Sequence, residues 1–372
     1  MKRLSVLLTV LSIILLLCSC SANVSLEASY TPKTYTLTLV DNGVVSDVDW
    51  VVNLEKTHGE DFVILGLTDI QLSSTEYILN FDHIREMVTS LVETAKPDLI
   101  VYLGDMSYGH WTSDLGICAF LDSFGIPWAP VYGNHDFEDS GMSPDTLSQV
   151  FRSFGNCVFK DGPDLLAVDL ANNVEAKGNY VVNIIERKPD SFEVVKSLVF
   201  FNSGTRGITD LQMQWYEDCM DSVKPYGTSV SSAIFMHIPI YEYRTAANAA
   251  YKGYATLEES YTPEVWNTGY ESSFGARHEG IGYRDTKPGY AEILKSKGNN
   301  LVVCGHNHTN CFCIGYDGMT YLYCLKTGPG CYYEEGMEGG TQIRISDTGS
   351  TDVNHWFFYD GLGCFSTPLA SI

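Results

Sequence analysis

Five apolar runs of β type in this chain each end in a residue that can bind a metal ion. The runs and their endings are 61–68 with Asp69, 98–104 with Asp105, 127–133 with Asn134 and His135, 232–236 with His237, and 300–305 with His306 and His308. Open α/β sheets carry their chemistry just beyond the carboxyl ends of their strands, so we expect these side chains to meet at one sheet edge. The pattern predicts a single metal site assembled from distant parts of the chain.

The donor set of this predicted site favours transition metals. It mixes carboxylate and amide oxygens with imidazole nitrogens, which suits iron, manganese or zinc better than calcium. Asp105 follows Gly104 at a strand end, and its carboxylate is the expected bridge between two ions. His306 and His308 are two residues apart, so on extended backbone both rings face one side and can serve different ions. We therefore expect a site for two divalent or mixed-valence ions.

Such a site predicts metal-assisted hydrolysis. A hydroxide held between the ions would attack, because metal coordination lowers the pKa of water to about 7. His135 is placed to protonate the leaving oxygen as a general acid, with Asp136 expected to orient its ring. A lone histidine at a strand end is more often an ordinary polar residue, but five coincident endings argue against that interpretation.

The first residues resemble an export signal. Lys2 and Arg3 precede an apolar stretch, 4–17, that is too short to span a bilayer comfortably. We expect 1–19 to be a signal peptide of the lipoprotein type and the mature chain to work outside the cytoplasm.

Cys20 is the expected lipidation site, because a small residue precedes it. Residues 20–30 would then be a short tether, and the protein would be anchored to the bacterial membrane only through this lipid. Ordinary cleavage after Ala22 is the alternative, since Cys20, Ser21 and Ala22 also form a small-residue site.

Charge and cysteine content limit the partners and the cross-links. The chain has 23 basic and 46 acidic residues, and removing Lys2 and Arg3 leaves 21 − 46 = −25. Such a surface repels nucleic acid and anionic lipid, so any anion must be bound at a local positive centre. Of the eleven cysteines, nine remain after Cys18 and Cys20, which gives no clean disulfide framework. Four of them lie near one another and are candidates for pairing across strands: Cys311, Cys313, Cys324 and Cys331.

The order of periodic segments predicts one α/β domain over 31–372, with two mixed β-sheets packed as a sandwich and flanked by helices. Expected helices cover 84–95, 114–124 and the segment after the Ser143 cap, and a capping box begins another at Thr209. Expected hairpins pair 180–186 with 192–201 and 311–316 with 320–325.

The segment 241–283 is an irregular insertion that contains seven tyrosines. It follows His237 directly, so it would form an aromatic lid over the substrate pocket. A long surface insertion held down by its tyrosines is an equally good interpretation.

Four blocks around the candidate ligands resemble one known family. They are Gly-Asp-Met-Ser-Tyr at 104–108, Gly-Asn-His-Asp at 133–136, His-Ile-Pro at 237–239 and Gly-His-Asn-His at 305–308. In this order they resemble the calcineurin-like metallophosphoesterase superfamily, and 235–243 and 305–310 resemble its single-domain branch related to purple acid phosphatases. The resemblance runs from Asp61 to Ser346 and implies a β-sandwich flanked by helices.

The resemblance also implies a function and two ligand sets. The chain would hydrolyse phosphate mono- or diesters, acting as a monomer on a small phosphorylated substrate or a phosphoprotein and binding no nucleic acid. By the resemblance, the first ion would be held by Asp69, Asp105 and His308, and the second by Asp105, Asn134, His237 and His306. His110 and Arg277 are weaker candidates for substrate contacts, because they lie near or downstream of these blocks.

One position departs from the family pattern. The first block usually reads Asp-x-His, whereas Asp69 is followed two residues later by Gln71. Purple acid phosphatases also lack that histidine, and a tyrosine at the position of Tyr108 ligates their iron. Gln71 and Tyr108 are therefore alternative ligands of the first ion, and Tyr108 as a plain pocket-wall aromatic is a third interpretation.

Two other functions compete with the leading one. A lipoprotein could keep this fold and bind a ligand or partner without catalysis, with Gln71 marking the decay of the site. Alternatively, a structural zinc cluster could form from neighbouring residues of one segment: Cys304, His306, His308, Cys311 and Cys313. The zinc cluster does not explain why four other strands end in ligands.

If the Tyr108 phenolate ligates iron, the iron-loaded protein is expected to show an iron–tyrosinate absorption band in the visible. The measurement is an absorption spectrum of purified protein with its iron content determined. A colourless, fully active iron-containing enzyme would exclude the tyrosinate.

Overall fold

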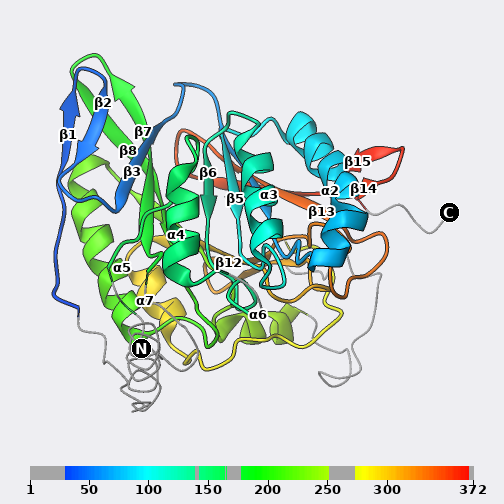
Figure 1. The fold of residues 1–372 in the computed structure, drawn as a ribbon. Helices are drawn as coiled ribbons and strands as arrows, with labels where there is room; N and C mark the ends of the chain where they lie inside the picture. The colour runs from blue at the N-terminus through cyan, green and yellow to red at the C-terminus, as the bar shows by residue number, and fades with distance from the viewer. Residues whose placement is uncertain (1–29, 139–141, 164, 166–176, 251–272, 368–372) are drawn as a thin grey trace, which may run out of the picture.

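A computed structural model describes residues 30–138, 142–163, 165, 177–250 and 273–367 (Figure 1). The expected signal peptide, Cys20 and most of the expected tether lie outside these residues, as does the middle of the tyrosine-rich insertion. The described chain forms two large mixed sheets with helices outside them, which confirms the expected fold class.

The first sheet has six strands in the order β15-β14-β13-β4-β5-β6. Its strands are β4 (Phe62–Leu67), β5 (Leu99–Tyr102), β6 (Trp128–Pro130), β13 (Gly339–Ile345), β14 (Thr351–Tyr359) and β15 (Gly363–Phe365). β4, β5 and β6 run parallel, whereas β13 is antiparallel to β4. Every residue of β4 and β5 is buried, as expected for parallel strands covered on both faces.

The second sheet has seven strands in the order β11-β12-β10-β9-β8-β7-β3. Its strands are β3 (Val51–Glu55), β7 (Tyr180–Lys188), β8 (Ser191–Phe200), β9 (Ser231–Phe235), β10 (Asn299–Cys304), β11 (Cys313–Tyr316) and β12 (Met319–Tyr323). β7–β8 and β11–β12 are the two expected hairpins, whereas β8, β9, β10 and β12 are parallel neighbours. The pairing of β3 with β7 and the small hairpin of β1 (Leu37–Val40) and β2 (Gly43–Ser46) were not predicted.

Helices cover the outer faces of the sheets. α2 (Ser74–Ala95) contacts β4 and β13, while α5 (Asp210–Val223) contacts β8 and α7 (Tyr290–Ser296) contacts β10 (Figure 1). The remaining helices are α3 (Trp111–Asp122), α4 (Pro144–Ser153), α6 (Glu242–Ala250) and the 3₁₀ turn η1 (Lys224–Tyr226).

Local capping chemistry places the helix starts where the sequence predicts them. The Ser143 side chain accepts the Thr146 N–H, and the Thr209–Gln212 capping box forms at the start of α5.

The two sheets share one apolar core. Tyr180 of β7 stacks on Phe200 of β8 at 4.6 Å between ring centroids, and Phe200 stacks on Phe235 of β9 at 5.2 Å. The Tyr180 hydroxyl donates to the Pro130 carbonyl at 2.8 Å, which ties the second sheet to the end of β6 in the first. This contact brings together the carboxyl ends of strands from both sheets, where the candidate ligands lie.

Two further features concern cross-links and membranes. All nine cysteines of the described residues have free thiols, so the pairings considered for Cys311, Cys313, Cys324 and Cys331 do not form. Cys311, Cys313 and Cys324 are buried, and Cys331 is exposed. Among the helices of the described segments, each is too short or too polar to span a bilayer.

Candidate metal centre

The candidate ligands lie in the turns just past four strand ends. Asp69 comes two residues after β4, Asp105 three after β5, His237 two after β9 and His306 two after β10. Asp69, Asp105 and His306 have positive φ angles of 55°, 55° and 73°, a left-handed conformation that is uncommon for residues other than glycine. Such conformations persist only where the surrounding contacts hold them, and they concentrate at functional sites.

Two glycines allow these turns to approach one another. A Cβ atom on Gly133 would lie 2.1 Å from both the backbone N and Oδ1 of Asp105. A Cβ atom on Gly305 would lie 2.0 Å from Thr68 Oγ1 and 2.6 Å from Asp69 Oδ2. Both distances are below any real contact, so only glycine fits between the turns.

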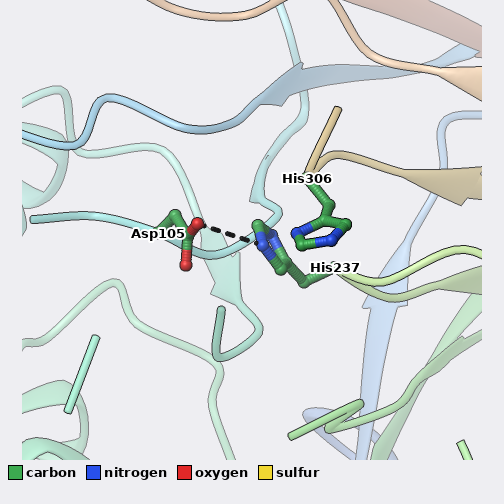
Figure 2. Close-up of side chains that lie close together, drawn as sticks. All are labelled: Asp105, His237 and His306. Atoms are coloured by element: carbon green, nitrogen blue, oxygen red, sulfur yellow. Dashed lines mark ion pairs between the residues drawn. The ribbon is translucent and has the colours of Figure 1, made fainter. Parts of the chain in front are cut away.

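The turns bring acidic and imidazole side chains into two groups that share Asp105. Asp105, His237 and His306 form one group, and Asp69, Asp105 and His308 the other, with the ligand atoms of each within 4.8 Å of one another. Figure 2 shows the first group, in which Asp105 Oδ2 lies 3.2 Å from His237 Nε2. The group of Asp69, Asp105 and His308 has the members of the first ligand set that the resemblance implies, and the other group has those of the second set without Asn134.

Backbone carbonyls orient two of the imidazole rings. His237 Nδ1 donates to the Leu103 carbonyl at 2.7 Å, and His308 Nδ1 donates to the Tyr332 carbonyl at 2.8 Å. A carbonyl can only accept, so Nε2 of each ring faces the other candidate ligands. His237 Nε2 lies 3.2 Å from Asn134 Oδ1, and His308 Nε2 lies 3.3 Å from Asp69 Oδ1. This arrangement is typical of histidine ligands of metals.

One buried oxygen atom of Asp69 and one of Gln71 indicate that cations fit between these groups. Asp69 Oδ2 accepts hydrogen bonds from Thr68 Oγ1 at 2.6 Å and from the His306 N–H at 3.0 Å. Asp69 Oδ1 and Gln71 Oε1 are fully buried, and neither receives a hydrogen bond from the described residues. A buried oxygen without a donor costs free energy that a bound cation would remove. The donor set and these two oxygens therefore fit two metal ions.

Electrostatics favour the ionised form of both carboxylates. Burial raises the pKa of Asp69, but His237, His308 and Lys326 outweigh it and hold the pKa below its usual value. Lys326 is buried, and its Nζ donates to the Asp69 carbonyl. Burial likewise raises the pKa of Asp105, and the charge and hydrogen bond of His237 lower it more.

The prediction that Asp136 orients the His135 ring is wrong. Asp136 instead accepts three backbone N–H groups, from Gly133 at 2.7 Å, Met106 at 2.6 Å and Asp105 at 3.2 Å. These three donors belong to the turns that carry Asp105 and Asn134. The Asp136 carboxylate therefore fixes the backbone of both turns. Glu138 contacts the His135 ring, with Oε2 2.7 Å from Nδ1.

The two alternative ligands of the first ion, Gln71 and Tyr108, occupy different positions. Gln71 is buried, and its Nε2 donates to Asp105 Oδ2 at 2.7 Å, which leaves Oε1 as its available ligand atom. The Tyr108 ring stacks on the His135 ring at 4.6 Å between centroids. Ligation by Gln71 or by Tyr108 stays a prediction.

A cleft of about 460 Å³ opens beside the two groups. His135, Tyr108 and Gln71 line it, but neither His110 nor Arg277 does. The His110 ring contacts Thr112, and Arg277 is buried against Asn248 and the Glu279 carbonyl, so the weak prediction of substrate contacts for these two residues is not supported. Further lining residues were not predicted from sequence: Glu279, Gly282, Arg284, Asn307, Cys331 and Tyr332. Asn307 lies inside the Gly-His-Asn-His block that follows β10, so that block could have indicated it. The other five follow no ligand strand and carry no comparable signal in the sequence.

Comparison with known proteins identifies a matching family. The family model of the calcineurin-like phosphoesterases matches residues 62–310, which include all the candidate ligands. The chain is 27% identical over 70% of its length to "Probable inactive purple acid phosphatase 28" of Arabidopsis thaliana. It is 28% identical over 69% of its length to "Phosphatase DCR2" of Saccharomyces cerevisiae. It spans 66% and 44% of the lengths of these two relatives.

A solved structure of a dimetal phosphatase from Danio rerio also resembles the chain. The match covers 79% of this chain and 98% of that one, with 13% identity and a TM-score of 0.45.

Metal uptake at pH 7 is expected to release about one proton per chain from His237. Burial lowers the pKa of this ring, but Asp105 outweighs burial and raises it to about 9, so a metal ion must displace a proton below that pH. Affinity should therefore rise as the pH approaches 9. His306, with a pKa lowered to about 3 chiefly by burial, is already neutral and releases none.

Calorimetry of metal binding in buffers of different ionisation enthalpy measures this release. The His58→Ala variant is the control, because His58 is exposed and pairs with Glu186 at the surface, so its loss should leave the proton count unchanged. A binding enthalpy that does not depend on the buffer would contradict the expectation.

Proposed function

The chain belongs to the calcineurin-like phosphoesterase family, and on that premise we propose that it hydrolyses phosphate mono- or diesters with two metal ions. The observation that carries this proposal is the pair of ligand groups that share the buried Asp105 carboxylate. Two-ion phosphatases hold the ions about 3.5 to 4 Å apart, and a shared carboxylate is the ligand such spacing requires.

The ligands divide between the ions as the groups do. Asp69, Asp105 and His308 would hold one ion, and Asp105, His237, His306 and the neutral Asn134 the other. When bound, the ions would supply the acidity that makes a coordinated water an effective nucleophile and the charge that stabilises the phosphoryl group. Iron, manganese and zinc all suit these donors.

His135 is the proposed general acid. Its ring lines the cleft with a quarter of the side chain exposed, so it is accessible to a leaving oxygen there. Its backbone N–H donates to Asp105 Oδ1 at 2.8 Å, which fixes the residue beside the shared ligand. Glu138 would stabilise the protonated ring through Nδ1 and leave Nε2 to donate the proton.

We also propose that the protein acts outside the cytoplasm, attached to the membrane by a lipid on Cys20. The basic residues, apolar stretch and cysteine at the amino terminus support this location. The net charge of −23 supports a monomeric protein that binds no nucleic acid. The proposed substrate is a small phosphorylated molecule or a phosphoprotein, and the metal ions would hold its phosphoryl group against this charge.

Binding without catalysis is the second candidate function. Gln71 occupies the place of the usual histidine, and the names of three relatives include the words "probable inactive". Against it, His135 and both ligand groups are present and converge.

Purified protein loaded with manganese, iron or zinc is expected to hydrolyse an activated aryl phosphate. His135→Ala should lower kcat by about 10² to 10⁴, because general acid catalysis is worth that much. Asn134→Ala should lower both activity and the occupancy of one ion, since the variant removes a ligand. The measurements are steady-state rates and metal content.

His58→Ala is the matched control, since it removes an exposed imidazole that does not line the cleft and should keep the wild-type rate. Metal binding with no hydrolysis of any aryl phosphate would favour the non-catalytic function. Equal rates for His135→Ala and wild type would refute the role of His135.

A further inference from the structure

Residues 279–284 form a wall of the cleft that is bound directly to the block containing His306 and His308. The Asn307 side chain accepts the Gly282 N–H at 3.0 Å and donates to the Gly280 carbonyl at 2.9 Å. Glu279 accepts the Thr309 N–H at 2.8 Å. These contacts position this wall relative to the metal ligands at three points.

The wall places a cation beside the second ion site. A Cβ atom on Gly282 would lie 2.9 Å from His306 Nε2, so the backbone passes directly over this ligand. Arg284, two residues further on, lines the cleft with an exposed side chain and has a positive φ of 52°. Burial is the main cause of the lowered pKa of His306, and Arg284 adds to it, which places the guanidinium within electrostatic range of the ring.

Among the described residues, Arg284 differs from Arg206 and Lys287 in having no anionic partner. Arg206 pairs with Asp285 at 2.7 Å, and Lys287 pairs with Asp210 at 2.6 Å. Within the described part of the chain, the Arg284 guanidinium forms no ion pair, although the chain has twice as many acidic as basic residues. Its five N–H groups are therefore available to a ligand in the cleft.

We propose that Arg284 binds the terminal phosphoryl group of the substrate and thereby makes the enzyme prefer phosphate monoesters to diesters. This inference rests on the proposed function. A monoester presents three non-esterified oxygens and up to two negative charges, whereas a diester presents two oxygens and one charge. The planar guanidinium can bind two phosphoryl oxygens at once, and its attraction grows with the charge of the ligand. It also offsets the repulsion of a dianion by the acidic protein.

The test compares Arg284→Ala and Arg284→Lys with wild type on an aryl phosphate and a bis-aryl phosphate. Arg284→Ala is expected to raise KM for the monoester by about tenfold or more, as the loss of a charge-assisted contact predicts, and to change KM for the diester by less than about threefold. Arg284→Lys should bind the monoester more tightly than Arg284→Ala but less tightly than wild type. Lysine keeps the positive charge but lacks the planar set of N–H donors that can bind two oxygens at once. Metal content should not change.

Arg206→Ala is the matched control. It removes the same charge from the same region but lies outside the cleft, so its KM values should equal those of wild type. Binding of inorganic phosphate to the metal-loaded protein, followed by calorimetry, tests Arg284 without turnover. Arg284→Ala should weaken Kd for phosphate by a factor similar to that for KM.

The outcomes separate the two proposals. Wild-type protein that binds phosphate but hydrolyses no ester would refute the proposed function, and the phosphate Kd would still test Arg284. Unchanged Kd and KM in Arg284→Ala would overturn the inference. Equal losses for monoester and diester, or loss of metal from the variant, would also overturn it, because Arg284 would then act on the site as a whole.

Discussion

The Asp105 carboxylate is the point on which the rest of this structure depends. It is 1% exposed and lies between an imidazole group from the second sheet and an acidic group from the first. A buried carboxylate is costly unless it is paired, and here Oδ1 accepts the His135 N–H while Oδ2 faces His237 and Gln71. The turns around it must approach so closely that Gly133 cannot carry a side chain.

Charge balance explains why the site is both stable and ready to bind cations. Asp69 and Asp105 are buried near each other, and the cations close to them, Lys326 and His237, are buried as well. A metal ion can displace the proton on His237, whereas Lys326 stays bonded to the Asp69 backbone. Metal binding would therefore replace one positive charge with a larger one.

Sequence reasoning predicted the parts that depend on local chemistry. Strand ends, the Ser143 cap and the Thr209 capping box follow from a few adjacent residues. Prediction from the sequence failed where contacts between distant segments determine the position of a side chain. Glu138 replaces Asp136 as the partner of His135 because the Asp136 carboxylate accepts backbone amides of two turns. Arg284 lines the cleft in a segment that Asn307 and Thr309 hold in place. The pairing of β3 with β7 likewise joins segments far apart in the chain.

The most direct test of the shared carboxylate is a crystal structure of the metal-loaded protein with anomalous scattering data. Two anomalous peaks are expected, both within coordination distance of Asp105, with Asp69 and His308 on one and His237 and His306 on the other. A single ion, or two ions of which only one contacts Asp105, would contradict this structure of the site.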